Sequence, residues 1–406
     1  METSRETEPG RRRALVLLAT TLVLSMSTWF SASAVIPQLR TEWGLTDSSA
    51  AWLTIAVQLG FVTGAVFSAV LSLSDIFHPK HVILGGSIGA ALANALVALA
   101  GGAAWGIPLR FATGFFLAGV YPSAFKLMST WTRKSRGVSL GILAGALVTG
   151  NGMPHLVNGL GGLDWRVVIY GTTILTIAGG LLAELAVDEG PYPFPKATFD
   201  PRQAGRVFGN RGVRLASFGY FGHMWELFAA YAWFLVFFSA HLELRGEGTS
   251  TTAAYTTFGF FLVSGFGCWA GGVLGDRWGR TKTTALMMAV SGSCCLLIGT
   301  LFGGPTWLVL LVALVWGFAI VADSAQFSTM VTELASQAYV GTALTLQLAV
   351  GFLITVATIW LIPMFEAAFG WQWAFALLAP GPALGVLAML RLKRAPDAAR
   401  IAGGRG

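Results

Sequence analysis

The sequence predicts an all-α membrane protein, with twelve transmembrane helices in two six-helix bundles and both termini in the cytoplasm. Of its 406 residues, 55% are hydrophobic and 11% are charged, whereas a soluble protein carries roughly 25% charged residues. Apolar segments of about 20 residues recur along the chain, and each is long enough to cross a hydrocarbon core of about 30 Å. A hydrophilic stretch at 187–213 separates six such segments from six more.

The apolar runs and the polar residues between them place the individual spans. We expect them at 14–36, 49–72, 82–101, 106–130, 138–160, 166–186, 214–240, 252–274, 282–302, 305–329, 341–363 and 372–391. The runs are continuous rather than alternating, which excludes a transmembrane β-barrel. The polar opening METSRETEPGRRR continues directly into the first apolar run, so we expect a retained first helix rather than a cleaved signal peptide.

Basic residues predict the side of the membrane on which each loop lies. With the N-terminus inside, most of the 26 lysines and arginines lie in cytoplasmic segments, and the opposite loops carry only Arg40, Arg166 and Arg245. Such an asymmetry is typical of multi-pass integral proteins, here of the plasma (inner) membrane. The predicted parts are a cytoplasmic N-terminal tail (1–13), an N-terminal six-helix bundle (14–186), a cytoplasmic linker (187–213), a C-terminal six-helix bundle (214–391) and a cytoplasmic C-terminal tail (392–406).

Several classes of function find no support in the sequence. The net charge of +7 follows from the loop asymmetry and does not indicate a nucleic-acid partner. The chain has no Walker-type phosphate loop, no His-Glu-x-x-His or Cys-x-x-Cys pattern, and no visible nucleophile–base arrangement. The three cysteines lie inside apolar segments and are interpreted as packing residues. We therefore expect no enzyme activity, no cofactor, no metal and a monomeric protein in the lipid bilayer.

The two halves contain a weak internal repeat. The segment LSLSDIFHPKH from Leu71 aligns with GVLGDRWGRTK from Gly272, which places Asp75 opposite Asp276. The starts of the sixth and twelfth spans also match, as DWRV from Asp164 and GWQW from Gly370. Two matches in the same order favour a duplicated six-span unit.

The second of these loops carries a family motif. It resembles the G-x-L-x-D-R-x-G-R-x-K loop of the major facilitator superfamily in seven residues: Gly272, Leu274, Asp276, Arg277, Gly279, Arg280 and Lys282. The N-terminal copy keeps Asp75 but has Ile76 in place of the arginine. In span four, Arg110 and Gly114 resemble the R-x-x-x-G motif of the same family. The resemblance implies two bundles that rock around a central site, with this loop as a conformational latch; a plain cytoplasmic turn is the alternative.

Span five is rich in glycine. Gly141, Gly145 and Gly150 partly resemble a motif of the family's exchangers, but the expected Gly-Pro pair is split by Met153. Close helix packing through small residues explains the same pattern.

Ionisable and amide side chains inside the spans are the candidate site, because such residues in membrane proteins usually face a bundle interior or a wet cavity. The resemblance implies a cavity lined by spans one, four, seven and ten. A buried carboxyl group can exchange a proton near neutral pH. The candidates for substrate binding and proton coupling are Glu226, His223, Asp323, Arg110, His155, Asn151, Tyr121, Gln326 and Gln347.

Alternatives stay open for most of these residues. His223 and Glu226 are three residues apart and can meet on one helix face as a proton relay or a substrate anchor. Asp323 can instead form a structural salt bridge with Lys126, and Arg110 can reach the outer headgroups. Glu226→Gln is expected to abolish a pH-driven component of transport; if it does not, Asp323 takes that role.

The sequence thus predicts a secondary active transporter that moves a small organic solute, with an anionic solute as one option. Proton-coupled uptake is the first hypothesis, and proton-driven efflux of a drug or metabolite is the second. A receptor or scaffold that does not transport is the third.

Overall fold

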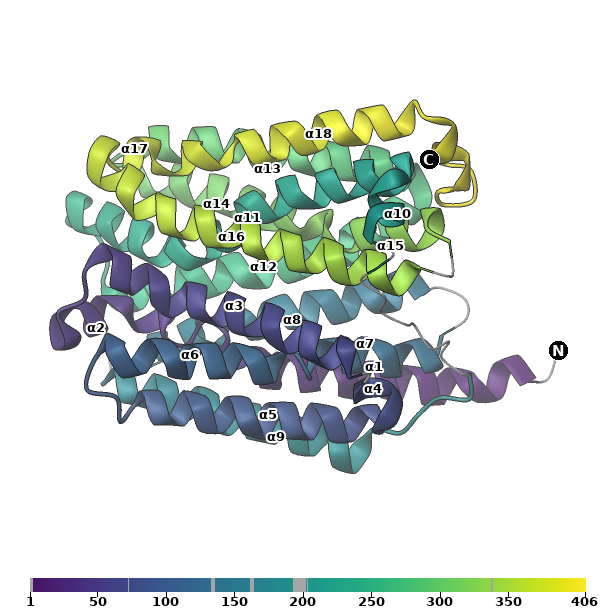
Figure 1. Ribbon diagram of the computed structural model, residues 1–406. Coiled ribbons are helices and arrows are strands. Elements are labelled where there is room, and N and C mark those ends of the chain that lie inside the picture. The colour runs from purple at the N-terminus through teal and green to yellow at the C-terminus, as the bar shows by residue number, and fades with distance from the viewer. Residues whose placement is uncertain are drawn as a thin grey trace.

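The computed structural model describes residues 3–71, 73–132, 136–160, 164–192, 202, 204–336 and 339–406, and these are almost entirely helical. Figure 1 shows the long helices side by side. In the N-terminal half the helices are α1 (Thr3–Ser25), η1 (Met26–Thr28), η2 (Ser33–Val35), α2 (Ile36–Trp43), α3 (Asp47–Val70), α4 (Leu73–Ile76), α5 (Pro79–Val97), α6 (Ala103–Leu117), α7 (Tyr121–Thr130), α8 (Arg136–Gly159) and α9 (Trp165–Ala186). The later ones are α10 (Ala204–Gly209), α11 (Arg211–Arg245), α12 (Ser250–Trp278), α13 (Arg280–Thr300), α14 (Thr306–Ala322), α15 (Ser324–Leu334), α16 (Val340–Phe369), α17 (Trp371–Ala374), η4 (Phe375–Leu378), α18 (Pro380–Lys393) and η5 (Pro396–Arg400).

The predicted all-α membrane fold is confirmed. Within the described residues, 11 helices are long and apolar enough to cross a membrane, and a twelfth span results if the bent pair Gly10–Thr28 and Ser33–Trp43 counts as one. The two parts of that pair meet at 52°. Span one is therefore broken between Thr28 and Ser33, whereas the sequence predicted one continuous helix over 14–36.

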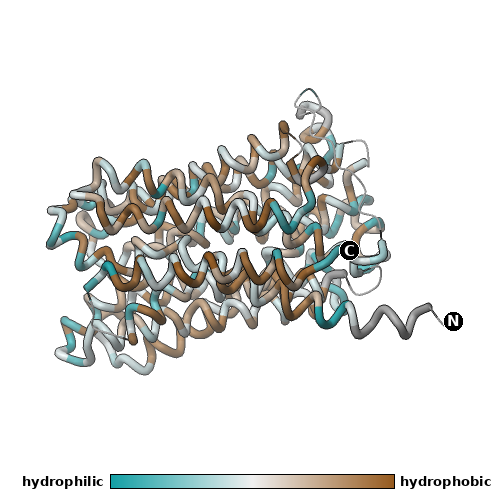
Figure 2. The backbone as a smooth tube through the Cα atoms, turned by 90° about the horizontal axis from the view of Figure 1, so that it is seen from below, coloured by the Kyte–Doolittle hydropathy of each residue, from teal (hydrophilic) through white to brown (hydrophobic). Residues whose placement is uncertain are grey.

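The two halves of the chain form separate layers. Figure 1 shows α1 to α9 in the lower layer and α11 to α18 in the upper one, and it places both chain ends at the same end of the bundle. Figure 2 shows hydrophobic residues along the middle of the helices and hydrophilic residues concentrated toward their ends, as expected for a protein that crosses a bilayer. The side of the membrane on which the termini lie and the domain boundaries stay predictions.

Span seven is longer than predicted. It continues past 240 to Arg245, and Gly246 ends it in the left-handed conformation with φ +62°. Just beyond, Glu247 accepts a hydrogen bond of 2.6 Å from Thr306 at the start of α14. This hydrogen bond, together with those from Arg245, lowers the pKa of the Glu247 carboxyl group. The polar residues that ended the predicted span thus belong to the helix end and tie it to span ten.

The halves touch most closely along α8 and α12. A Cβ atom on Gly145 would lie 2.5 Å from the carbonyl oxygen of Gly265, and one on Gly152 would lie 2.5 Å from Cβ of Phe261. Only a residue without a side chain fits at such distances. This close approach favours the interpretation of the span-five glycines as packing residues.

Candidate functional site

Arg110 of α6 lies against the break in span one. Its side chain is completely buried. One terminal nitrogen donates to the carbonyl oxygen of Thr28 (2.9 Å), to Oγ of Ser31 (2.9 Å) and to Oδ1 of Asn94 (3.1 Å). The other terminal nitrogen donates to the carbonyl oxygen of Trp29. Arg110 thus supplies side-chain donors to the carbonyl groups at the break, where regular helical bonding is interrupted.

This geometry corrects one interpretation of Arg110. Its side chain does not reach the outer headgroups, because none of it is exposed. Both terminal nitrogens already bind protein acceptors, so the arginine supports the backbone of span one. The neighbouring Gly114 of the R-x-x-x-G motif has a packing role, since a Cβ there would lie 2.0 Å from the carbonyl oxygen of Val57 on α3.

Glu226 of α11 lies inside the C-terminal half. Its carboxylate accepts hydrogen bonds from Nε1 of Trp316 (2.6 Å), from Oγ of Ser291 (3.0 Å) and from Sγ of Cys295 (3.1 Å). These donors belong to α13 and α14, and the glutamate is 1% exposed. The predicted pairing of His223 with Glu226 is wrong, because the structure gives each residue a different partner.

The two halves hold their first span in the same manner. In the N-terminal half, Asn94 of span three and Arg110 of span four bind span one. In the C-terminal half, Cys295 of span nine and Trp316 of span ten bind Glu226 of span seven. The two polar clusters occupy corresponding positions in the two halves, but the N-terminal cluster is built on an arginine and the C-terminal cluster on a carboxylate. This correspondence favours a structural role for Glu226.

Replacing Glu226 tests that role. Glu226→Leu leaves the indole donor of Trp316 buried without its acceptor, which costs about 1–3 kcal/mol. It also removes one of the two acceptors of Ser291, which still donates to the carbonyl oxygen of Met288. We expect a clearly lower melting temperature for the purified protein. Glu226→Gln keeps an amide oxygen for Trp316 and is the matched control, with a melting temperature close to that of the wild type. If Glu226→Leu melts like the wild type, the carboxylate does not hold spans seven, nine and ten together.

His223 and Asp323 form the second buried charged site. Nδ1 of His223 and Oδ1 of Asp323 are 2.9 Å apart, and the side chains are 1% and 3% exposed. They are at ion-pair distance without the alignment of a hydrogen bond, and Nε2 of His223 has no partner among the described residues. Asp323 lies at the break between α14 and α15, so its carboxylate is placed at a helix end. The contact that the structure gives Asp323 is thus His223 rather than the alternative partner Lys126.

Aromatic rings surround this pair and continue to the boundary between the halves. The His223 ring lies 6.1 Å from the Tyr220 ring and 5.6 Å from the Phe327 ring. Across the boundary, Phe61 of α3 lies 4.9 Å from Phe352 of α16. Further ring contacts across the boundary join Trp29 to Phe228 and Phe352, and Phe30 to Phe228, Tyr231 and Phe261. Rings from both halves therefore meet in one aromatic layer, which Tyr121 joins by stacking on Phe61 at 5.5 Å.

Polar groups without partners lie on the helices that meet at this boundary. Both ring nitrogens of His155 and Oδ1 of Asn151 on α8, and Nε2 of Gln347 on α16, are buried without a hydrogen-bond partner among the described residues. The His155 ring stacks on Phe261 at 5.5 Å. Buried polar groups normally bind something, so these atoms are where a polar solute or water can bind.

Gln58 of α3 belongs to the same group and was missed in the sequence. It is completely buried, and both its amide nitrogen and its amide oxygen lack partners among the described residues. The signal that selected Gln347, a glutamine in the middle of an apolar span, applies equally to Gln58. Because α3 and α16 run in opposite directions (Figure 1), the two glutamines lie on opposite sides of the Phe61–Phe352 contact.

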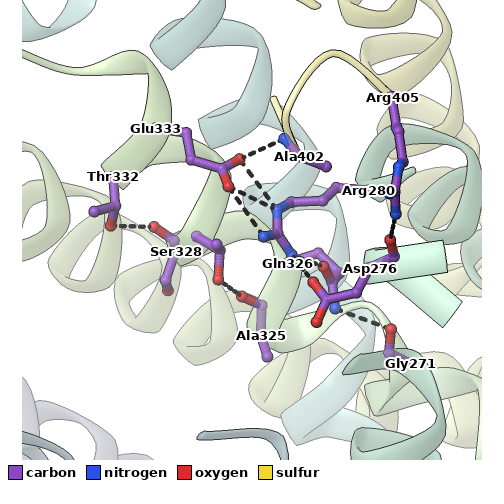
Figure 3. Close-up of polar contacts among 11 residues, drawn as sticks. Gly271, Asp276, Arg280, Ala325, Gln326, Ser328, Thr332, Glu333, Ala402 and Arg405 are labelled. Atoms are coloured by element: carbon purple, nitrogen blue, oxygen red, sulfur yellow. Dashed lines mark hydrogen bonds and ion pairs between the residues drawn. The ribbon is translucent and has the colours of Figure 1, made fainter. Parts of the chain in front are cut away.

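The loop with the family motif forms a separate charged cluster, shown in Figure 3. Arg280 binds Glu333 of α15 (3.0 Å), Asp276 (3.2 Å) and Oε1 of Gln326 (3.0 Å). Gln326 also donates to the carbonyl oxygen of Gly271 (3.0 Å). Gln326 therefore belongs to this loop and not with the candidate substrate residues.

The C-terminal tail covers the same loop. The backbone nitrogen of Ala402 donates to Glu333 (3.2 Å), and Arg405 donates to the carbonyl oxygen of Asp276. Gly279 has φ +96° and lies so close to the tail that a Cβ would be 2.4 Å from the carbonyl oxygen of Arg405. Among the described residues, the side-chain hydrogen bonds of the loop thus join α12, α13, α15 and the tail, all of the C-terminal half.

Two further motif residues belong to this loop, and Asp75 belongs to its N-terminal counterpart. Gly272 reaches the other half, since a Cβ on Gly141 of α8 would lie 3.9 Å from Cα of Gly272. Arg277 is exposed. The backbone of Asp75 lies in α4, but its side chain falls outside the described residues. A latch between the halves stays a prediction.

A family model for the Major Facilitator Superfamily matches residues 17–244 and 226–406. The chain belongs to the major facilitator superfamily. No curated protein matches the sequence at a significant level. In the described part of the chain, no cluster of three or more His, Cys, Asp or Glu residues could hold a metal ion.

Solved structures of this superfamily share the fold. The D-xylose–proton symporter has a TM-score of 0.75 at 16% identity, covering 95% of this chain and 98% of the other. An inward-facing, unoccupied bacterial homologue of the human lysosomal transporter Spinster has a TM-score of 0.68 at 16% identity (95% and 96%). The E. coli fucose:proton symporter has a TM-score of 0.63 at 15% identity (93% and 98%). At these identities the likeness shows the transporter fold.

Proposed function

We propose that the protein is a secondary active transporter that takes up a small, neutral, polar solute together with a proton. The observation that carries the proposal is the buried His223–Asp323 pair at the break in span ten. A carboxylate and an imidazole in an apolar surrounding are costly, and transporters use such groups to carry protons. The side chains also lie on spans seven and ten, two of the spans expected to line the central cavity.

The proposed solute site lies at the boundary between the halves. Its polar groups are the unpartnered atoms of Gln58, Gln347, Asn151 and His155, with the aromatic layer as apolar walls. Amide and imidazole groups hydrogen-bond hydroxyl groups well. Arg110, the cation expected to favour an anion, is already bound to the protein. These features support a neutral solute with several hydroxyl groups over an anionic one.

The proposal extends to the setting of the protein. We propose a monomer in the plasma membrane with both termini in the cytoplasm, as the basic residues predict, and with the six-plus-six domain division described above. Transport then proceeds by rocking of the two bundles around the site.

A flux assay tests the proposal. Purified protein in liposomes is given an inward proton gradient and radiolabelled D-xylose, L-fucose, glycerol or lactate. We expect accumulation of at least one of the neutral solutes and its loss with a protonophore, compared with protein-free liposomes. Lactate is not expected to accumulate. The proposal is contradicted if only lactate is taken up, if uptake does not depend on the proton gradient, or if no neutral solute is taken up.

Direction is tested in cells. Uptake predicts that cells overproducing the protein accumulate the solute faster than cells lacking it. Greater resistance to toxic amphipathic compounds without faster accumulation indicates efflux and overturns the proposed direction. A receptor or scaffold predicts no flux in either assay.

A further inference from the structure

A groove on the C-terminal half has the features of a phospholipid site. Its volume is about 530 Å³, within the range of ligand-binding pockets. Its walls come from α11 and α18, with Ile354 contributed by α16. None of the sequence-predicted site residues lines it.

One stripe of each helix faces the groove. Lining residues of α11 recur every three or four positions and therefore share a face: they include Leu215, Phe218, Gly222 and Trp225. On α18, Leu384 and Leu387 are 64% and 51% exposed. Large apolar side chains that remain this open on a transmembrane helix meet lipid.

The groove has two unlike ends. At one end α11 and α18 touch, since a Cβ on Gly222 would lie 2.3 Å from the carbonyl oxygen of Gly381, and Trp225 donates to the carbonyl oxygen of Leu377 (3.0 Å). At the other end lies Arg391, the one charged residue among the described residues that line the groove. The groove is thus apolar along its length and positively charged at its mouth.

Its length matches one leaflet of a bilayer. From Leu215 to Trp225, α11 rises about 15 Å at 1.5 Å per residue, which is half of a hydrocarbon core of about 30 Å. Arg391 therefore lies near the depth of the headgroups when the apolar end reaches the midplane. Arg214 and Lys393, at the same ends of α11 and α18, add positive charge there.

We propose that this groove binds an anionic phospholipid, with an acyl chain between α11 and α18 and the phosphate at Arg391. Apolar contact alone does not favour one lipid over another in a bilayer, whereas a basic group at the surface attracts anionic headgroups. The bound lipid packs on α11, the helix that also carries His223. The site is independent of the identity of the transported solute.

Lipid binding to the full-length protein tests the proposal. Native mass spectrometry of the detergent-purified protein is used to titrate phosphatidylglycerol and phosphatidylcholine, both with palmitoyl and oleoyl chains. We expect tighter binding of phosphatidylglycerol. Arg391→Gln is expected to weaken that binding about five-fold, the effect of one basic residue at a membrane surface, and to leave phosphatidylcholine binding unchanged. Leu384→Trp fills the groove and weakens the binding of both lipids.

The control variant is Arg400→Gln, which removes an exposed cation of η5 outside the groove. It is expected to bind both lipids like the wild type. Equal affinities of the wild type for the two lipids, or equal losses in Arg391→Gln and Arg400→Gln, overturn the proposal. A competing outcome is that tetraphenylphosphonium displaces phosphatidylglycerol from the wild type but not from Leu384→Trp. This result would identify the groove as an entry path for amphipathic solutes instead.

Discussion

Asp323→Asn is expected to reduce proton-driven uptake to the level of protein-free liposomes. Asparagine has nearly the shape of a protonated aspartate but cannot release a proton. The variant therefore behaves like a carrier that stays protonated, and it cannot return without solute to start a new uptake cycle. Exchange of labelled for unlabelled solute needs no net proton movement and is expected to persist. Uptake under an inward proton gradient and exchange at equal pH, measured on the same liposomes, separate these two activities.

The matched control is Glu226→Gln, which neutralises the other buried carboxylate of the C-terminal half. It is expected to retain uptake driven by the proton gradient, because the structure places Glu226 among donors of α13 and α14. If Glu226→Gln loses the gradient dependence and Asp323→Asn keeps it, the proton is carried by Glu226, as first predicted from the sequence. Loss of exchange as well as uptake in Asp323→Asn would point to a role in folding or solute binding.

Arg110→Leu is expected to destabilise the protein more than any other single change described above. It removes the side-chain donor of the Trp29 carbonyl oxygen and one donor each from the Thr28 carbonyl oxygen, Ser31 and Asn94. Ser31 still donates to Thr28 and to Asn94. The unsatisfied carbonyl oxygen of Trp29 costs about 1–3 kcal/mol, and the lost contacts of the other three groups add to this cost. The melting temperature and the yield of monodisperse protein in detergent measure it.

Arg110→Lys is the conservative variant for comparison. A lysine keeps the positive charge but not the planar fork that reaches two carbonyl groups at once, so we expect an intermediate melting temperature. If Arg110→Leu instead keeps the wild-type melting temperature and loses solute binding, the arginine binds the solute.

The topology was predictable because the bilayer imposes it. Backbone groups in lipid must bond within their own segment, so continuous apolar runs become helices with few alternatives. The breaks were harder to predict. The run MSTWFSAS around residues 26–33 contains neither proline nor glycine, and the break is stabilised by Arg110, which lies about 80 positions away in the chain.

The sequence predicted candidate residues but not the partners that the structure gives them. Helix spacing tells which residues share a face of one helix, so it suggested that His223 meets Glu226. It does not tell which neighbouring helix each residue faces, and the structure pairs His223 with Asp323 on span ten. Gln326 was misplaced for the same reason, because its partner Arg280 comes from the loop before span nine.

Because Arg110 binds the backbone of span one, it is not available to neutralise an anionic solute, and this affects the charge that each transport cycle moves. If the solute is neutral and the proton is the one charge that moves with it, each transport cycle carries one positive charge across the membrane. At 100 mV, inside negative, this charge contributes about 2.3 kcal/mol, equivalent to roughly a fifty-fold concentration ratio of the solute. The membrane voltage alone would then drive accumulation, even when the pH is equal on both sides.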